Sequence, residues 1–188
     1  MEAIVDIETD AIDASTIHCI VAKHYQTGEM REWVGDQCQE FGEWSKRISK
    51  FIMHNGISFD APILNKLTGS AIAPAQVRDT LIESQLYNPV RDGGHSLQSW
   101  GERFGFPKID YHDFKHYTPE MLEYCKRDVD LTHKVAQKLE EDSKGFSDSC
   151  YNLERNIRII LDKQQRNGFA FNLREAQILL APVSYTHL

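Results

Sequence analysis

The N-terminal strand limits the possible folds of this chain more than any other segment. Residues 3–5 form a short apolar run, and Asp6, Ile7 and Glu8 follow it directly. Residues two apart in a strand point to the same face, so we expect Asp6 and Glu8 to project together from the strand end. Two neighbouring carboxylates repel each other unless a cation, a proton or a basic group lies between them. A divalent metal ion would meet this need, whereas a solvated turn is the simpler explanation for this pair alone.

The composition allows an ordinary globular domain around that strand. The 188 residues are 41% hydrophobic and 26% charged, which fits one folded domain with room for an appendage. No apolar run approaches the roughly 20 residues that span a bilayer, and the N-terminus lacks the pattern of a signal peptide. We therefore expect a cytoplasmic protein with no membrane partner.

The charge and the cysteines argue against several classes of site. The net charge of -7 argues against a broad basic surface for nucleic acid, because such a surface needs an excess of lysine and arginine. The four cysteines show no Cys-x-x-Cys spacing, which argues against a zinc knuckle, a redox pair or a dense disulfide framework. We expect four reduced thiols.

The first part of the chain has the order of a mixed α/β sheet. Alternating residues predict strands at 3–7, 15–25 and 30–34, which would form an antiparallel meander. Helical spacing over 39–50 then leads into a short strand at 51–53. Strand, helix and strand in this order predict a parallel crossover beside the first strand. In such sheets the ligand crevice lies beyond the carboxyl ends of the strands.

A third acid follows the fourth expected strand. His54, Asn55 and Gly56 end that strand at the same rim, and Asp60 opens a helix that Ser58 could cap. Asp60 could therefore join the first two carboxylates. The alternative is a first-turn acid that only complements the helix dipole.

Asp79 is a further candidate, because it ends a short expected strand at 77–80. The loop at 108–117 contains His112 and His116, which are four residues apart. They could bind a metal ion together if the loop were helical, but the surrounding residues favour an irregular surface loop.

The longest helical pattern begins at Thr118, with Pro119 at the first helical position. Tyr124 and Asp128 are four residues apart on one face of this helix, close to its apolar stripe. Asp128 is therefore expected to be partly buried, where a lone carboxylate needs a metal ion or a hydrogen-bond donor. Asp130 points elsewhere and is expected to be solvated.

Three short motifs occur in this order along the chain: Asp6-x-Glu8, Asn55-Gly56-x-x-Phe59-Asp60 and Tyr124-x-x-x-Asp128. Together they resemble the exonuclease motifs of the DEDD superfamily, tyrosine subclass. That family contains the proofreading 3'-to-5' exonucleases of DNA polymerases, on a ribonuclease H-like fold. The resemblance covers residues 1–141, and the details are most similar to bacteriophage enzymes of polymerase family A. It implies a mixed sheet, an antiparallel meander plus parallel strands, flanked by helices and followed by a partial helical segment.

The resemblance also implies roles for the acids. Such enzymes hydrolyse single-stranded DNA ends to nucleoside monophosphates with two divalent ions, Mg²⁺ or Mn²⁺. By this resemblance Asp6 would bridge both ions, and Glu8 and Asp128 would complete the site that activates water. Asp60 would hold the second ion mainly through water, and Tyr124 would orient the attacking water.

The resemblance implies weaker substrate contacts as well, at Thr9, Ile12, His54, Asn55 and Phe59. Ile12 would wedge against the terminal base, and Asn55 would contact the strand. Glu8 would also contact the terminal 3' hydroxyl.

The C-terminal part implies a larger enzyme. Residues 153–172 resemble the helix and turn that open the polymerase domain of that family. We therefore expect an exonuclease domain at 1–145 and the helical start of a truncated polymerase domain at 146–188. Residues 182–188 break the helical pattern of 174–181 and are candidates for a non-native end. The expected partners are a single-stranded DNA 3' end, the missing polymerase domain in cis and a processivity factor.

Three alternatives stay open. A free-standing DEDD-type exoribonuclease would use the same chemistry on RNA, although the polymerase-like segment argues against it. The second alternative is a non-catalytic exonuclease-like scaffold of a polymerase. The complete set of acids and the tyrosine argue against it. The third is a metal-binding or nucleotide-binding module without hydrolysis, for which the chain lacks a glycine-rich phosphate loop.

Overall fold

The computed structural model describes the backbone of residues 1–185 and the side chains of residues 1–180. Within this part of the chain, one sheet has the strand order β3-β2-β1-β4-β5. The strands are β1 (Glu2–Thr9), β2 (Ile17–His24), β3 (Met30–Val34), β4 (Lys50–Met53) and β5 (Val77–Asp79). The helices are η1 (Gly35–Glu40), α1 (Phe41–Ser45), α2 (Asp60–Thr68), η2 (Pro74–Gln76), α3 (Thr80–Tyr87), α4 (Leu97–Arg103), α5 (Pro119–Asp142), α6 (Asp148–Asn167) and α7 (Leu173–Tyr185).

β1 is the central strand and has one antiparallel and one parallel neighbour. It runs antiparallel to β2, with Asp6 opposite Val21, and parallel to β4, with Ala3 opposite Phe51. β3 extends the sheet by an antiparallel pair and β5 by a parallel one. The predicted meander and crossover are therefore confirmed. The carboxyl ends of β1, β4 and β5 lie at one rim of the sheet.

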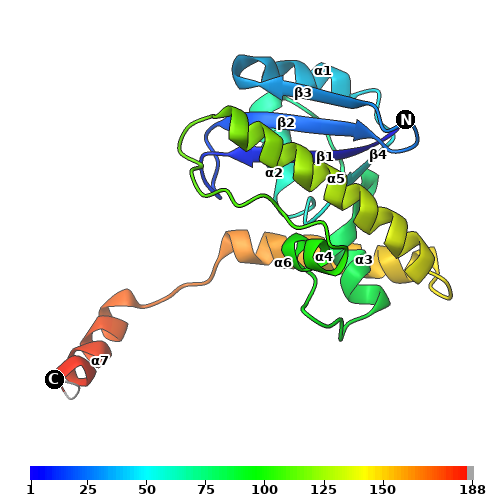
Figure 1. The fold of residues 1–188 in the computed structure, drawn as a ribbon. Helices are drawn as coiled ribbons and strands as arrows, with labels where there is room; N and C mark the ends of the chain where they lie inside the picture. The colour runs from blue at the N-terminus through cyan, green and yellow to red at the C-terminus, as the bar shows by residue number, and fades with distance from the viewer. Residues whose placement is uncertain (186–188) are drawn as a thin grey trace.

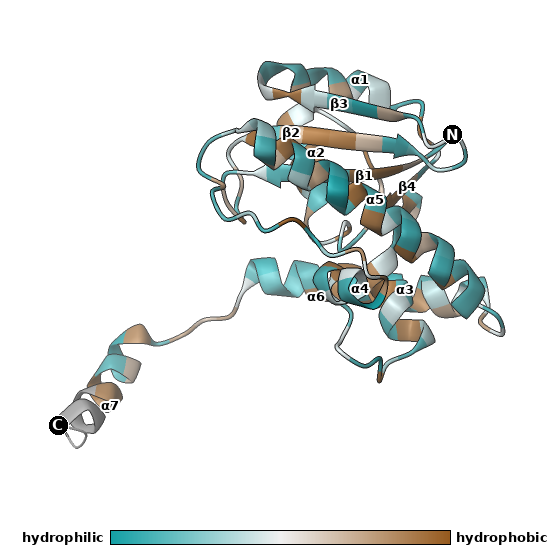
Figure 2. Cartoon of the chain, viewed as in Figure 1, coloured by the Kyte–Doolittle hydropathy of each residue, from teal (hydrophilic) through white to brown (hydrophobic). Residues whose placement is uncertain are grey.

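Different helices cover the two faces of the sheet (Figure 1). Val5 and Ile7 of β1 pack in a core cluster with residues of α1 and α2, whereas Ile4 packs with residues of α5. Figure 2 shows β2 as a largely hydrophobic strand among helices that carry many hydrophilic residues. Because side chains alternate along a strand, Asp6 and Glu8 share the face of Ile4. The N-terminal acids therefore lie on the side of the sheet that α5 covers.

The helix predicted over 39–50 is wrong in extent, since η1 and the short α1 replace it and a turn leads into β4. Gly42 lies against the carbonyl of Thr68, where an added Cβ atom would come within 2.2 Å of the oxygen. The Trp33 and Phe41 rings pack edge to face with their centres 5.2 Å apart. The apolar residues at helical spacing thus reflect aromatic packing on the sheet rather than one continuous helix.

One local prediction was wrong because the side chain contacts a distant residue. Ser58 does not cap α2; its hydroxyl donates to Asp162 of α6, with distances of 2.8 and 3.0 Å to the two carboxylate oxygens. The side chain of Asp130 is 37% exposed, as predicted, and its Oδ1 also lies 2.7 Å from Nζ of Lys23. Neither partner could be read from the local sequence.

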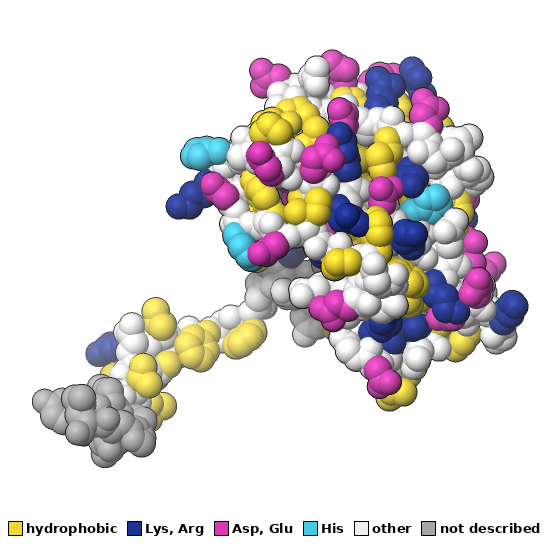
Figure 3. Space-filling model, in the orientation of Figure 1, with side chains coloured by type: hydrophobic (Ala, Val, Ile, Leu, Met, Phe, Trp, Pro, Cys, Tyr) yellow, Lys and Arg dark blue, Asp and Glu magenta, His cyan; other side chains and the backbone are white. Residues whose placement is uncertain are grey.

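The C-terminal helices differ in how they contact the rest of the molecule. In α6, the Tyr151 hydroxyl accepts a hydrogen bond from the Asp79 backbone at 2.7 Å and donates to the Val77 carbonyl at 3.2 Å. α7 extends away from the sheet at the end of a connector (Figure 1), and hydrophobic side chains along this part are exposed (Figure 3). In the described part of the chain, no helix is long and apolar enough to cross a membrane.

The helical break predicted for residues 182–188 does not begin at Pro182, because α7 continues to Tyr185. A proline inside a helix removes one backbone hydrogen bond and can kink the helix without ending it. Residues 186–188 lie outside the described part of the chain.

Candidate active site

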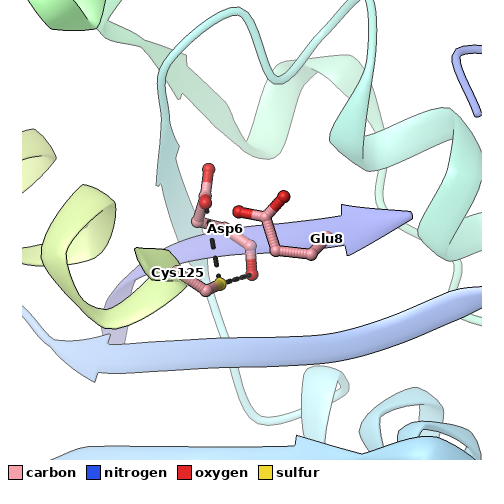
Figure 4. A group of neighbouring side chains, drawn as sticks. All are labelled: Asp6, Glu8 and Cys125. Carbon is pink, nitrogen blue, oxygen red and sulfur yellow. Dashed lines mark hydrogen bonds between the residues drawn. The ribbon is translucent and has the colours of Figure 1, made fainter. Parts of the chain in front are cut away.

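The end of β1 brings two predicted ligands together under α5. Asp6 and Glu8 project from β1, and Cys125 approaches them from α5 (Figure 4). One potential ligand atom of each residue lies within 4.8 Å of the other two. The Sγ atom of Cys125 lies 3.6 Å from both the carbonyl oxygen and Oδ2 of Asp6. Cys125, which the sequence predicted only as a reduced thiol, is thus a neighbour of the acids.

Asp128 is buried on α5, with 3% of its surface exposed. Its Oδ2 lies 2.6 Å from Nζ of Lys108. Its Oδ1 is buried and has no hydrogen-bond partner in the described structure. A buried oxygen without a partner costs free energy. This atom therefore calls for a further donor or a cation.

Asp60 reaches the same rim from the first turn of α2 and is 3% exposed. Burial raises the pKa of this carboxyl to about 7. Its charge is in turn a cause of the raised pKa of Asp6. The structure thus brings the four predicted acids to one rim, although Asp60 and Asp128 lie outside the tight group that Asp6 and Glu8 form with the thiol.

The acids at this rim cannot all be ionised without a compensating charge. Burial raises the pKa of Asp6 well above its ordinary value, and the carboxylates of Asp60 and Glu8 add to the rise. Burial, followed by the charge of Asp128, raises the pKa of Glu8 to about 9. In the metal-free protein, Glu8 therefore holds a proton near neutral pH.

Lys108 is a site residue that sequence analysis did not identify. Its Nζ atom pairs with Asp128 and lies 4.5 Å from the centre of the Tyr124 ring. Burial opposes its charge, but the neighbouring Asp128 carboxylate raises the pKa of Lys108 above its ordinary value. The residue lies in an irregular loop with no periodic pattern. No local signal could have linked it to an acid on another element.

The loop at 108–117 forms one wall of the site. The ring centres of Tyr111 and Phe114 lie 5.7 and 5.9 Å from that of Tyr124. The loop has no regular secondary structure and His112 is exposed, as predicted. Burial raises the pKa of Tyr124 to about 12, so its phenol keeps its proton at neutral pH.

The residues predicted as substrate contacts fall into two groups. Ile12, Asn55 and Phe59 line a cavity of about 790 Å³ that α6 borders, and we call this cavity the α6 groove. Thr9 and His54 do not line it. The Thr9 hydroxyl donates to a nearby carbonyl at 2.9 Å, and Nδ1 of His54 lies 2.9 Å from a threonine hydroxyl of α3.

Asp79 holds the second motif in place. Its carboxylate accepts hydrogen bonds from the backbone N–H groups of Asn55, Ile57 and Leu81 at 3.0, 3.1 and 3.0 Å. Asn55 has a φ of 66°, a conformation that few residues other than glycine adopt. Asp79, the strand-end candidate from the sequence, therefore stabilises a turn, and backbone N–H groups already occupy its carboxylate oxygens.

The rim residues fit divalent metal ions by their chemistry. Mg²⁺ prefers carboxylate oxygens and keeps several waters, so a few acids suffice to bind it. A bound cation would satisfy the free Oδ1 of Asp128 and favour ionised Glu8. The thiol of Cys125 suits Mg²⁺ poorly, and burial holds its pKa well above its ordinary range.

The sequence is similar to two phage DNA polymerases. The DNA-directed DNA polymerases of Escherichia phage T7 and Enterobacteria phage T3 are each 25% identical to it, in alignments that cover 93% of this chain and 34% of the polymerase. This chain therefore spans about a third of the length of these relatives. No protein-family model matches the sequence. The predicted resemblance to a bacteriophage DNA polymerase is confirmed.

Two solved structures share the fold. Brucella melitensis NrnC bound to pGG matches with a TM-score of 0.67 and 18% identity, over 92% of this chain and 90% of NrnC. Phi29 DNA polymerase in complex with primer-template DNA matches with a TM-score of 0.52 and 12% identity, over 76% of this chain and 32% of the polymerase. These matches confirm the predicted ribonuclease H-like mixed sheet.

Proposed function

We propose that this chain, a relative of phage DNA polymerases with a ribonuclease H-like fold, is a metal-dependent 3'-to-5' exonuclease of the DEDD type, tyrosine subclass. Its substrate is a single-stranded DNA 3' end, and its products are nucleoside monophosphates. The observation that carries the proposal is the burial of Asp6 among other carboxylates; burial first, and then the neighbouring charges, raise the pKa of that residue well above its ordinary value. Such a cluster gains free energy when cations enter it.

Four acids, Asp6, Glu8, Asp60 and Asp128, would hold two divalent ions, Mg²⁺ or Mn²⁺. Bound ions of this kind activate water for attack and stabilise the charge that develops on the leaving 3' oxygen. Asp6 is the residue best suited to bridge two ions, because the other three acids all act on its pKa. Asp128 offers its unpartnered Oδ1 as a ligand.

Tyr124 would orient the attacking water through its phenol. Since its raised pKa keeps the proton on the oxygen, Tyr124 positions water and does not serve as a base. Glu8 would also contact the terminal 3' hydroxyl. Ile12 and Phe59, which line the α6 groove, would hold the terminal base.

We further infer that the chain is the proofreading part of a larger polymerase. Residues 1–145 would form the exonuclease domain, and residues 146–188 the helical start of a polymerase domain. The sequence similarity to phage T7 polymerase, of which this chain covers 34%, supports placing the chain within a longer polymerase. The polymerase domain would then be a partner in cis, and a processivity factor a second candidate partner.

The test is a degradation assay on single-stranded DNA labelled at its 5' end. With Mg²⁺, the purified chain should shorten the strand stepwise from the 3' end. Asp128→Asn should lower the rate at least ~100-fold, because it removes a charged metal ligand. Asp130→Asn is the matched control, since it removes one carboxylate from the same helix at a residue that pairs with Lys23. An unchanged rate in Asp128→Asn would contradict the assignment.

The match to NrnC covers 90% of that protein, so the fold also occurs without a polymerase domain, and a free-standing exonuclease that acts on RNA is the second candidate. An RNA strand of identical sequence, assayed in parallel, distinguishes the two. Faster degradation of RNA would favour the exoribonuclease. No degradation of either strand with Mg²⁺ or Mn²⁺ would favour a non-catalytic scaffold.

A further inference from the structure

The α6 groove opens beside the candidate active site. Its volume of about 790 Å³ is in the range of ligand-binding sites. Ile12, Asn55 and Phe59 line one side, and Phe59 directly precedes the rim acid Asp60. A strand whose 3' end lies among the acids would therefore enter this groove.

The other side of the groove carries two basic residues of α6, with Asp162 between them. Within the described chain, neither Arg158 nor Arg166 forms an ion pair with a carboxylate. Their guanidinium groups reach only neutral oxygens, of Gln85 at 3.5 Å and of the Ser58 carbonyl at 3.4 Å. Guanidinium groups are well suited to phosphate because they donate several hydrogen bonds in one plane. The two arginines are therefore available to a polyanion.

The spacing of these residues places them on one face of α6. Residues 158, 162 and 166 are four apart, so they lie one above the other, and the two arginines are about 12 Å apart along the helix axis. Asp162 lies between them and is engaged by the Ser58 hydroxyl at 2.8 Å. This contact holds α6 against the second motif. The same face of α6 thus contacts the second motif through Asp162 and places the two arginine side chains at the groove.

We propose that the α6 groove holds the single-stranded segment behind the 3' end, with Arg158 and Arg166 contacting its phosphates. This inference rests on the proposed exonuclease function and extends it. It makes α6, which sequence analysis assigned to the polymerase part, a wall of the exonuclease substrate site. A strand several nucleotides long reaches the arginines, whereas a dinucleotide is held at the acids alone.

The experiment compares Arg158→Gln/Arg166→Gln with Lys163→Gln, which removes one charge from an exposed residue of α6 outside the groove. Binding of a fluorescent ten-nucleotide strand is measured by anisotropy across salt concentrations, with phosphorothioate linkages that resist hydrolysis. The double variant should bind roughly tenfold more weakly at low salt, and the slope of log Kd against log salt should fall by about 1.4 for two lost phosphate contacts. Lys163→Gln should bind like the wild type. Lys163→Gln should also hydrolyse a deoxydinucleotide at the wild-type rate.

Two results separate the inference from the proposed function. If the strand is degraded normally and the double variant binds it as Lys163→Gln does, the groove assignment is overturned and the exonuclease stands. If the wild type degrades nothing but the double variant still loses affinity and salt slope, the groove assignment stands and the exonuclease fails. A ten-nucleotide RNA in the same assay shows whether the groove distinguishes the two sugars.

Discussion

Lys108 gives the acidic site a positive charge of its own. Its ammonium lies 2.6 Å from Oδ2 of Asp128, one of the proposed metal ligands. A divalent ion bound to the same carboxylate would lie close to this ammonium, and two cations at such a distance repel each other. Lys108 therefore stabilises the metal-free site at the expense of metal affinity.

Replacing Lys108 by methionine should tighten metal binding, because the side chain keeps its apolar stem and loses its charge. We expect the Kd for Mn²⁺ to fall by about tenfold, an order-of-magnitude figure for removing one nearby charge in a partly buried site. Isothermal titration calorimetry measures this directly. Lys108→Arg keeps the charge and serves as the control. A Kd that is unchanged or higher in Lys108→Met would show that the lysine does not compete with the metal ion.

Asp79 acts between elements, since it joins β5, α3 and the turn after β4 through three backbone hydrogen bonds. Asp79→Asn replaces an acceptor oxygen by a donor that faces backbone N–H groups. We expect a loss of about 2–3 kcal/mol in the free energy of unfolding, measured by urea denaturation. Asp10→Asn is the comparison, because Asp10 also accepts backbone hydrogen bonds, from Ser15 and Thr16, but in an exposed turn. Equal losses in the two variants would contradict this role of Asp79.

Elements with a strong local pattern were predictable from the sequence, and those shaped by tertiary contacts were not. The central strand β1 and the long helix α5 carry clear patterns, an apolar run in one and a Thr118 cap in the other, where the hydroxyl accepts from Met121 at 3.2 Å. The helix predicted before β4 was too long, because apolar residues that pack on the sheet happen to have helical spacing. The role of Lys108 at the site and the contact between Ser58 and Asp162 could not be predicted, since both depend on residues far apart in the chain.

The candidate site shows the same division. Topology was enough to predict that Asp6, Glu8 and Asp60 share a rim, because it sets where strands end and helices start. Asp128 lies within α5 and was linked to them only by the resemblance of the three motifs. Their protonation was not predictable. It depends on burial and on mutual repulsion, which raise the pKa of Glu8 to about 9.

For the whole molecule, the raised pKa values make metal-free stability depend on pH. The pKa of Glu8 rises from 4.5 to about 9 and that of Asp60 from 3.8 to about 7. For an acid whose pKa is higher in the folded state, the stabilising contribution is complete below the unfolded-state pKa and is lost as the pH rises through the folded-state value. In EDTA, the melting temperature should therefore fall between pH 5 and pH 9.

Glu8→Gln should make this fall shallower, because glutamine imitates the protonated side chain and cannot ionise. Saturating Mn²⁺ should restore stability at high pH, because it binds the ionised form. Melting curves in EDTA and in Mn²⁺ provide the measurement, with Glu120→Gln on the exposed side of α5 as control. The same slope in Glu8→Gln as in the wild type would rule out Glu8 as a source of the effect.

The connector between α6 and α7 has a consequence for proteolysis. Phe169 and Phe171 are 87% and 66% exposed in a segment without helix or strand, which is the kind of segment that proteases cut first. Limited chymotrypsin digestion should cleave there before it cleaves after Phe146, which is 41% exposed in the turn before α6. The large product would keep α6 against the sheet and should melt at the same temperature as the uncut protein. In a longer polymerase, a cut in this segment would leave α6 attached to the exonuclease fold and separate it from the residues that follow.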